Sequence, residues 1–378
     1  MPRSSVVTLP GDPAPSAVFA PPGDDRPPPA EWAPVRRPVP AARTTPSGDP
    51  LPPVGRLLRR YPGAGEPLSC HPVTLGLLNR GYRLSTTRGV YFLKHHLDGD
   101  RAAIARQHTA TFRLQGLGVP VAPPVEDGGG ATLAVLGGHC YALHPWVDGR
   151  HRYGAELTAA QSRRLGSLLG TVHTRLAEVM APAADLPDAH ASADPEETFA
   201  LIGTLLRLAR SARPRDSFDT LAEHRLLQRR VLLAEHAGRR PPPGGGGGWV
   251  HGDFHPLNLL YRGAEPAAIV DWDRLGVHPR AEEAVRAAAI FFVQPAGELD
   301  LPKVRAYARA YRRAAGADAA ELAAAVHRVW WERLNDFWIL RWRYELQDRR
   351  ADPQFPAVSA LVVWWTRRYT AVLDAFTR

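Results

Sequence analysis

The amino-acid sequence predicts an α+β fold of two lobes, in which a small N-terminal antiparallel sheet with one packed helix precedes a larger, mostly helical lobe. β-type runs broken by short turns lie between residues 81 and 143, whereas apolar residues recur at helical spacing after Gly149. The chain of 378 residues is long enough for two hydrophobic cores and a tail. We therefore expect a small lobe over 53–146 and a large lobe over 147–378, with a ligand site in the cleft between them.

The N-terminal segment 1–52 has the composition of a disordered tail. Its first fifty residues contain fourteen prolines and few aromatic residues, so they cannot bury enough apolar surface to offset the loss of chain entropy. A second flexible segment is expected at 238–248, where three prolines are followed by five glycines.

The elements of the small lobe follow from its turn and capping residues. Residues 54–61 suit a short helix, and the runs 81–85 and 90–94 flank a four-residue turn, which predicts a β-hairpin. Asp100 can cap a helix over 101–115. Further strands are expected at 119–121, 132–136 and 139–143.

The large lobe is predicted to be helical on both sides of the flexible segment. Leu165, Leu169 and Val172 follow helical spacing, and the ranges 196–237 and 281–378 are helical as well. The last range holds six of the ten tryptophans, which we interpret as core residues: Trp330, Trp331, Trp338, Trp342, Trp364 and Trp365.

Charge and cysteine content indicate a cytoplasmic protein that binds neither nucleic acid nor a membrane. The formal charge is +9, but arginine is scattered along the chain rather than clustered. Cys70 and Cys140 lack metal-type spacing and suit free thiols in a reducing compartment. No apolar run reaches membrane-spanning length.

Lysine and asparagine are rare in this chain, which makes their positions informative. Lysine occurs only at 94 and 303, and asparagine only at 79, 258 and 335. Because arginine supplies nearly every other cation, a motif position that keeps one of these rare residues is a candidate for chemistry that arginine cannot perform.

Two neighbouring segments, 251–258 and 267–273, carry residues suited to metal binding and proton transfer. Asp253 lies in a turn-forming segment and is the candidate base that takes a proton from an attacking hydroxyl. Asn258 and Asp271 offer the hard oxygen ligands that Mg²⁺ prefers, and Asp271 ends a strand-like run that would direct it to the site.

Other polar residues of these segments have more than one interpretation. His255 could donate a hydrogen bond to a transferred phosphate. Asp273 alternates with Asp271 and suits a second metal, a cap or a surface salt bridge equally well. His251 is interpreted as a structural histidine that orients the loop, and His173 as a core histidine on an apolar helix face.

Lys94 ends the second strand of the predicted hairpin. Its compact ammonium acts as a point charge that can contact two phosphate oxygens. The turn that precedes the hairpin contains Asn79 and Gly81, whose backbone N–H groups could fold over a phosphate. The turn is not a Walker A loop.

These motifs together resemble the aminoglycoside phosphotransferase and choline kinase-like family, which is related to the protein kinases. The resemblance covers about 70–376, and it implies a two-lobed protein kinase-like fold, ATP and Mg²⁺ as cofactors, and a small molecule with a hydroxyl group as acceptor. It rests on His251-Gly252-Asp253 with Asn258, on Ile269-Val270-Asp271, on Leu93-Lys94 and on the helix 165–173.

The resemblance also implies a role for each motif residue. Asp253 would be the catalytic base, Asn258 and Asp271 would bind magnesium, and Lys94 would bind the α- and β-phosphates. The segment Leu143–Val147, which includes Trp146, would be the hinge between the lobes and hold adenine by backbone hydrogen bonds.

One position departs from the family pattern. The family has a glutamate on the small-lobe helix that pairs with the lysine, and Gln107 stands there in this chain, on the same helix face as Ile104 and Leu114. The amide of Gln107 can hydrogen-bond Lys94 but brings no charge. A catalytically weakened nucleotide-binding protein is therefore an alternative function.

The function that the sequence favours is an ATP- and Mg²⁺-dependent phosphotransferase that moves the γ-phosphate to a hydroxyl group of an antibiotic, an amino alcohol, a homoserine-like compound or a sugar. A metal-dependent hydrolase is a further alternative, because His251, Asp253 and His255 alternate like metal ligands. That alternative leaves Asn258 and Lys94 without a role.

The acceptor site is the least specified part of the prediction. Glu332 and Asp336 are one helical turn apart near two tryptophans and could receive a cationic acceptor. Ion pairs with arginines such as Arg333 are the alternative for both residues. The identity of the acceptor and the oligomeric state stay open.

Overall fold

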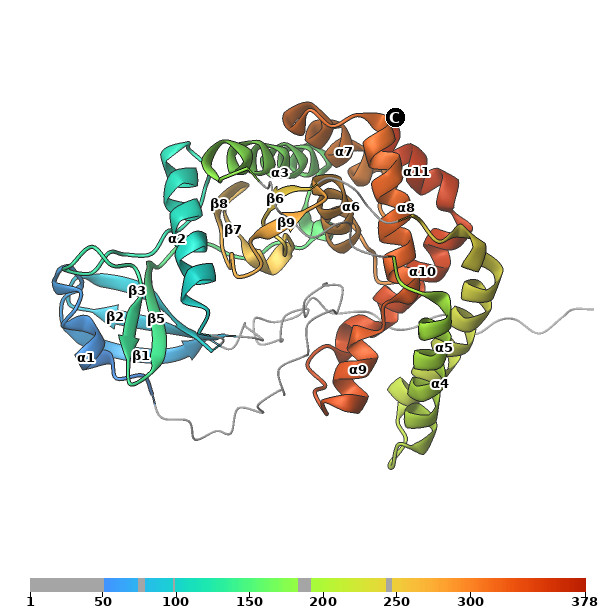
Figure 1. The fold of residues 1–378 in the computed structure, drawn as a ribbon, viewed down its shortest axis with the longest axis horizontal. Helices are drawn as coiled ribbons and strands as arrows, with labels where there is room; N and C mark the ends of the chain where they lie inside the picture. Colours follow the sequence, from blue (N-terminus) through green and yellow to red (C-terminus); the bar gives the residue numbers. More distant parts are fainter. Residues whose placement is uncertain (1–50, 74–78, 98, 183–191, 243–246) are drawn as a thin grey trace, which may run out of the picture.

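The computed structural model describes residues 51–73, 79–97, 99–182, 192–242 and 247–378, and it has the predicted α+β composition and two lobes. Figure 1 shows the sheet of the small lobe on one side and the helices of the large lobe on the other. Most of the predicted tail and residues 243–246 of the predicted flexible segment lie outside the described residues, so disorder there stays a prediction.

Five antiparallel strands form the sheet of the small lobe, in the order β1-β2-β3-β5-β4. The predicted hairpin is present as β2 and β3, and its turn joins Thr86 to Gly89. Leu84 and Leu93 are fully buried in one core with α1 (Val54–Leu58). The strands are β1 Pro67–Val73, β2 Arg80–Thr86, β3 Gly89–His96, β4 Ala134–Leu136 and β5 His139–Pro145.

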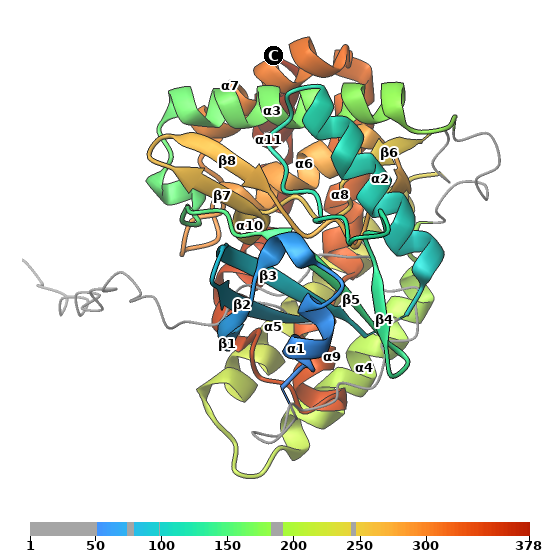
Figure 2. The same ribbon diagram turned by 90° about the vertical axis from the view of Figure 1, so that its left-hand side faces the viewer.

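The predicted helix of the small lobe is α2 (Arg101–Gly116). The side chain of Asp100 caps it by accepting a hydrogen bond from the Ala103 N–H at 3.0 Å. The chain leaves the helix through Gly118, whose φ of +77° is favourable only for glycine. Figures 1 and 2 both show α2 between the sheet and α3 (Ala159–Val179), so this helix joins the two lobes.

The prediction of a strand at 119–121 is wrong. Val121 forms only an isolated parallel bridge with Ile269. Pro120 has no N–H to donate to a sheet, and its carbonyl instead accepts a hydrogen bond from the Ile269 N–H at 2.8 Å. This segment therefore ties the small lobe to the strand that precedes Asp271.

Strand β1 was not predicted, because its sequence contains Pro67 and Pro72. Proline cannot donate to a sheet, so it argues against a central strand. The strand pairs only with β2 and lies at the edge of the sheet, where proline is tolerated.

The large lobe is built from helices α3 to α11. The predicted helical range 196–237 is divided at 212–216 into two helices, α4 and α5, which lie side by side at the outer end of the lobe in Figure 1. The helices after α3 are α4 Pro195–Ser211, α5 Ser217–His236, α6 Arg280–Phe291, α7 Leu301–Ala315, α8 Ala319–Asn335, α9 Trp338–Glu345, α10 Phe355–Arg367 and α11 Tyr369–Thr377. The six tryptophans predicted as core residues are buried or packed against the core of this lobe.

Helices α3 and α7 approach each other closely at two glycines. A Cβ atom on Gly166 would lie 2.1 Å from the carbonyl oxygen of Tyr307, and one on Gly170 would lie 2.9 Å from that of Tyr311. The missing side chains let the two backbones come together, while Leu165 and its neighbours on α3 enter the core.

Two short sheets inside the large lobe carry the motif segments. Of their strands only the run at 267–270 was predicted, and it corresponds to β8. In one sheet β6 (Gly248–Val250) pairs with β9 (Gly276–His278), and in the other β7 (Leu259–Arg262) pairs with β8 (Glu265–Ile269). Figure 1 shows both sheets beside α3, between α2 and α6.

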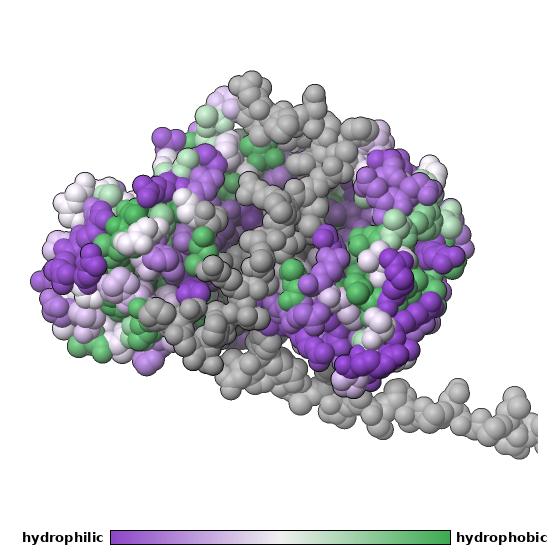
Figure 3. All heavy atoms as spheres, turned by 60° about the horizontal axis from the view of Figure 1, so that its bottom comes forward, coloured by the Kyte–Doolittle hydropathy of each residue, from purple (hydrophilic) through white to green (hydrophobic). Residues whose placement is uncertain are grey.

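The surface hydropathy, the two cysteines and the apolarity of the helices can be compared with what the sequence predicted. On the face in Figure 3, hydrophilic residues are interspersed with hydrophobic ones on both lobes. Cys70 and Cys140 are free thiols, as predicted. Within the described ranges, no helix combines the length and the apolarity that crossing a membrane requires.

Candidate active site

The loop between β6 and β7 contains a glycine in a left-handed conformation that other residues rarely adopt. Gly252 has a φ of +85°, and a Cβ atom there would lie 2.1 Å from the carbonyl oxygen of Arg274. Only glycine fits this position, because any other side chain would force the loop away from the segment that follows β8. The loop and that segment are therefore one unit.

A buried carboxylate, Glu283 at the start of α6, supports the same loop. It accepts hydrogen bonds from the backbone N–H groups of His251, at 3.2 Å, and Gly252, at 2.5 Å. It also contacts Nε2 of His173 at 2.7 Å, while Nδ1 of His173 lies 3.0 Å from the Tyr311 hydroxyl. Burial opposes ionisation of Glu283, but these hydrogen bonds outweigh it and hold the pKa below its ordinary value.

The sequence analysis missed Glu283, although the sequence contained a signal. The residue is a glutamate among buried residues of α6 that are otherwise apolar, such as Ala284, Ala287 and Ala288. An acid within an apolar helix face needs a buried partner. The interpretation of His173 as a satisfied core histidine is confirmed, since it is fully buried with both ring nitrogens in contact.

Asp253 lies in the loop with its carboxylate almost fully buried. Its Oδ2 is 3.3 Å from Nδ2 of Asn258 and 3.4 Å from Nε2 of His255. Burial favours the neutral acid, but His255 and the guanidinium of Arg274 outweigh it and keep the pKa of Asp253 below its ordinary value. The carboxylate is thus ionised at neutral pH and able to accept a proton.

His255 faces Asp253 in this structure. Its Nδ1 accepts a hydrogen bond from the Leu257 N–H at 3.2 Å, which leaves the hydrogen on Nε2. That Nε2 lies 3.4 Å from Oδ2 of Asp253, where it can donate to the carboxylate. His251 has a different partner, because its Nε2 contacts the carbonyl oxygen of Val270 at 3.0 Å.

The contacts of the two histidines test the alternative of a metal-dependent hydrolase. Nε2 of His251 and Nε2 of His255 contact different partners. In the part of the chain that the structure describes, no three His, Cys, Asp or Glu side chains converge in a way that could hold a metal ion. The His251, Asp253 and His255 set therefore does not form the three-ligand site that this alternative requires.

Asn258 connects the loop to the segment after β8. Its Nδ2 donates to the carbonyl oxygen of Asp253 at 2.9 Å, and its own backbone carbonyl accepts from the Val270 N–H at 2.9 Å. The loop thus uses the amide nitrogen, which directs the oxygen Oδ1 elsewhere. Asp271 follows Val270 directly, so an amide oxygen and a carboxylate lie in adjacent segments.

Asp271 has a left-handed backbone conformation, with a φ of +58°, which is uncommon for a residue other than glycine. Its side chain keeps 40% of its surface exposed. Burial of the carboxylate raises its pKa, but the ammonium of Lys94 at 2.7 Å outweighs this and holds the pKa of Asp271 well below its ordinary value. The site therefore contains an ionised, accessible carboxylate.

Lys94 lies between two carboxylates of the large lobe. Its Nζ is 2.7 Å from Oδ1 of Asp271 and 2.6 Å from Oδ1 of Asp273. Burial alone would lower the pKa of Lys94, but the two carboxylates raise it above its ordinary value. Burial and the neighbouring charge of Asp271 raise the pKa of Asp273 to about 6.

The other predicted phosphate-site residues lie close to Lys94. Gly81 is its register partner across the hairpin, and a Cβ atom there would lie 2.7 Å from the ring of Phe92. The Nδ2 of Asn79 donates to the carboxylate of Asp273. The Nε2 of Gln107 donates to the backbone carbonyl of Asp273 at 3.2 Å, so the expected hydrogen bond from Gln107 to Lys94 is replaced by one to the large lobe.

The predicted hinge, 143–147, begins within the last residues of β5. The carbonyl of Leu143 accepts a hydrogen bond from the Val125 N–H at 2.6 Å, and the Trp146 N–H donates to the carbonyl of Val90 at 3.1 Å. The guanidinium of Arg83 lies 5.3 Å from the centre of the Trp146 ring. These two backbone groups already have partners within the small lobe, so they do not present free hydrogen-bonding groups to adenine.

The predicted acceptor residues separate in the structure. Glu332 is engaged by Arg286 of α6, with two hydrogen bonds of 3.0 and 2.7 Å. Glu332 thus forms an ion pair with a nearby arginine, as the alternative expected, but the pair is part-buried rather than at the surface. Its role in acceptor binding stays a prediction.

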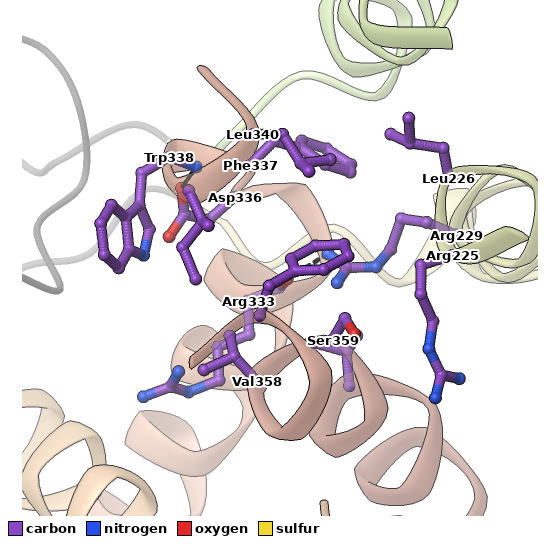
Figure 4. Close-up of a pocket in the computed structure, with 13 residues that line it drawn as sticks. Arg225, Leu226, Arg229, Arg333, Asp336, Phe337, Trp338, Leu340, Val358 and Ser359 are labelled. Atoms are coloured by element: carbon purple, nitrogen blue, oxygen red, sulfur yellow. Dashed lines mark hydrogen bonds between the residues drawn. The ribbon is translucent and has the colours of Figure 1, made fainter. Parts of the chain in front are cut away.

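Asp336 lies in a small cavity between α5, α8, α9 and α10, shown in Figure 4. Arg229 and Arg333 line the same cavity, whose volume of about 30 Å³ suits one or two water molecules. Asp336 accepts a hydrogen bond from the Trp338 N–H at 3.0 Å. Burial and the charge of Glu332 raise its pKa to about 7.

Fold and site together define a two-lobed phosphotransferase. Residues 69–317 match the model of the phosphotransferase enzyme family (APH), and the chain belongs to this family. A comparison with curated protein sequences finds no match.

Solved structures with the same fold include several small-molecule kinases. Spectinomycin phosphotransferase APH(9)-Ia, in complex with ADP and spectinomycin, is 14% identical with a TM-score of 0.56, over 85% of this chain and 96% of that chain. A microcompartment-associated aminopropanol kinase is 16% identical with a TM-score of 0.55, over 86% and 99%. The amicoumacin kinase hAmiN, in complex with AMP-PNP and Ca²⁺, is 17% identical with a TM-score of 0.52, over 84% and 92%.

Proposed function

We propose that this chain transfers the γ-phosphoryl group of ATP, with Mg²⁺, to a hydroxyl group of a small molecule. The observation that supports the proposal best is the continuous set of contacts from Asp253 through Asn258 to Asp271 and Lys94. This set joins a base, oxygen ligands and a cation where the lobes meet, and phosphoryl transfer requires these groups together.

The residues fit a magnesium ion. Asn258 supplies a neutral amide oxygen that the loop does not use, and Asp271 supplies an ionised carboxylate that is 40% exposed. Mg²⁺ prefers such oxygen ligands and retains several waters. When bound, the metal would neutralise charge on the phosphates.

Each residue of the site then has a role in the reaction. Asp253 accepts the proton of the acceptor hydroxyl as that oxygen attacks the γ-phosphorus and the bond to the β-phosphate oxygen breaks, which releases ADP. His255 orients Asp253, and Lys94 binds the α- and β-phosphates. The turn with Asn79 and Gly81 covers the phosphates, and adenine contacts backbone groups of the hinge other than the engaged Leu143 carbonyl and Trp146 N–H.

The acceptor is proposed to be a hydroxyl-bearing small molecule, such as an antibiotic, an amino alcohol, a homoserine-like compound or a sugar. The named substrates of structurally similar kinases, spectinomycin among them, support this class. Asp336 remains a candidate contact for the acceptor.

A coupled ADP-release screen over hydroxyl-bearing metabolites and antibiotics tests the proposal, with the Asp253→Asn variant as background. We expect at least one compound to give Mg²⁺-dependent ADP release in the wild type and a roughly 1,000-fold smaller rate in the variant, because the general base is lost together with its charge. Equal rates in both proteins would refute the role of Asp253.

Gln107 supports the second candidate, a nucleotide-binding protein with weakened catalysis. Both candidates predict ATP binding, which Asp253→Ala should leave intact. They differ in turnover: a wild type that binds ATP and Mg²⁺ but phosphorylates no compound in the screen would favour the second.

A further inference from the structure

The buried ammonium of Lys94 needs a counter-charge, and among the described residues its carboxylate partners lie outside its own lobe. A buried charge is stable only when it is paired. The helix that packs beside it, α2, has the sequence RAAIARQHTATFRLQG and contains no aspartate or glutamate. Within the part of the chain that the structure describes, the carboxylates within salt-bridge distance of Lys94 are Asp271 and Asp273, and both come from the large lobe.

The two carboxylates are not equivalent. The side chain of Asp271 is 40% exposed, whereas that of Asp273 is 18% exposed. Asp271 also lies beside Asn258, so under the proposed function it is the carboxylate that binds the metal ion. Asp273 is also held by two further groups of the small lobe. Asn79 donates to its carboxylate, and Gln107 donates to its backbone carbonyl at 3.2 Å.

From this arrangement we propose that Asp273 is a positioning residue that holds Lys94 for phosphate binding, and that Gln107 anchors the backbone of Asp273. Under the proposed function, Asp271 is then free to bind metal while Asp273 keeps Lys94 in place. Asp273 carries the negative charge on the segment after β8, and the side-chain amide of Gln107 on α2 holds that segment. Together the two residues keep a carboxylate beside Lys94.

The scarcity of lysine allows a direct test that needs neither nucleotide nor activity. Lys94 and Lys303 are the only lysines of the chain. Acylation of each by an amine reagent, followed by mass spectrometry, reports how firmly Lys94 is paired. Lys303, whose Nζ contacts Asp300 at 3.3 Å and the carbonyl of Gly154 at 2.9 Å, is an internal reference for general unfolding.

We expect Asp273→Asn to raise the acylation rate of Lys94 roughly 10-fold relative to Lys303, since it removes one of the two charges that hold the ammonium. It should also lower kcat/KM for ATP about 10- to 100-fold at saturating Mg²⁺. Adding Gln107→Glu to this variant returns a carboxylate to the neighbourhood of Lys94. Both the protection of Lys94 and kcat/KM should recover in part, because the new carboxylate replaces the lost charge but not the hydrogen bond from Gln107 to the backbone carbonyl of residue 273.

The same Gln107→Glu change should be harmful in the wild type. A third carboxylate would face the carbonyl and the side chain of Asp273, and like charges repel. We therefore expect kcat/KM to fall in the single variant and to rise when Gln107→Glu is added to Asp273→Asn. A merely structural role of Asp273 would not produce this reversal of sign.

Two results would overturn the proposal. Unchanged acylation of Lys94 in Asp273→Asn would show that Asp273 does not hold it. A raised half-saturating Mg²⁺ concentration without rescue by Gln107→Glu would identify Asp273 as a metal ligand instead. The acylation measurement stands apart from the proposed function, because a wild type without phosphotransferase activity would leave the labelling comparison of Lys94 and Lys303 intact.

Discussion

The catalytic loop and the environment of Lys94 are stabilised in different ways. The loop is supported from within its own lobe, where Glu283 accepts hydrogen bonds from two consecutive backbone N–H groups and contacts His173. Lys94 takes its counter-charges from the opposite lobe, through Asp271 and Asp273. The difference indicates that Asp253 is positioned by the fold of one lobe, whereas Lys94 is positioned only when the two lobes are together.

The largest effect should come from breaking the support of the loop. Glu283→Ala leaves two backbone N–H groups and a buried histidine without their acceptor, which should cost about 3–5 kcal/mol of folding free energy. Displacement of Asp253 should also lower kcat roughly 100-fold. Chemical denaturation and steady-state kinetics measure both, and a variant with normal kcat would show that the loop does not depend on Glu283.

A change in the helix packing of the large lobe should affect stability without changing nucleotide affinity. In Gly166→Ala the new methyl group would meet the backbone carbonyl of Tyr307, which cannot move aside as a flexible side chain could. We expect a loss of about 2 kcal/mol. Gly203→Ala on α4 is a matched control, because only Arg207 lies within 4 Å of its Cβ position, and it should stabilise the protein slightly.

The pH dependence of stability should reveal the charge on Glu283. Its pKa in the folded protein is below its ordinary value, so its contribution is present above the unfolded pKa and is lost as the pH falls through the folded pKa. In the wild type, the temperature at the midpoint of thermal unfolding should therefore decrease as the pH is lowered below about 4.5. Glu283→Gln should flatten this acid limb, and an identical pH profile would contradict the assignment.

The smallest effect should come from Asn79, which contacts Asp273 from the small lobe. Asn79→Ala removes one hydrogen bond to the carboxylate and should raise KM for ATP roughly 5-fold, in line with about 1 kcal/mol. Because the residue is only half-buried, the unfolding midpoint should hardly change. A large loss of stability with unchanged KM would reverse the proposed contrast between the lobes.

The fold and the motif residues could be predicted because their signals are local. The hairpin around Thr86 and Gly89 has a turn between two β-type runs, and α2 has a capping residue in Asp100. Asp253, Asn258 and Asp271 lie in two short segments that one lobe brings together.

The partners of these residues could not be predicted, because they depend on distant contacts. Glu283 meets His173 across 110 positions, and Asp273 meets Gln107 across 166. The pairing of Glu332 with Arg286 joins two helices whose rotation about their axes the sequence does not specify. Strand β1 was missed because its prolines are compatible with a strand only at an edge.

The prolines of β1 have a consequence for the behaviour of the protein in concentrated solution. An exposed edge strand offers a row of backbone groups on which a strand of another molecule can pair. Pro67 and Pro72 remove two N–H donors from this strand. The open side of the small lobe is thereby a poor template for intermolecular β-sheet, which should keep the protein resistant to aggregation through this edge.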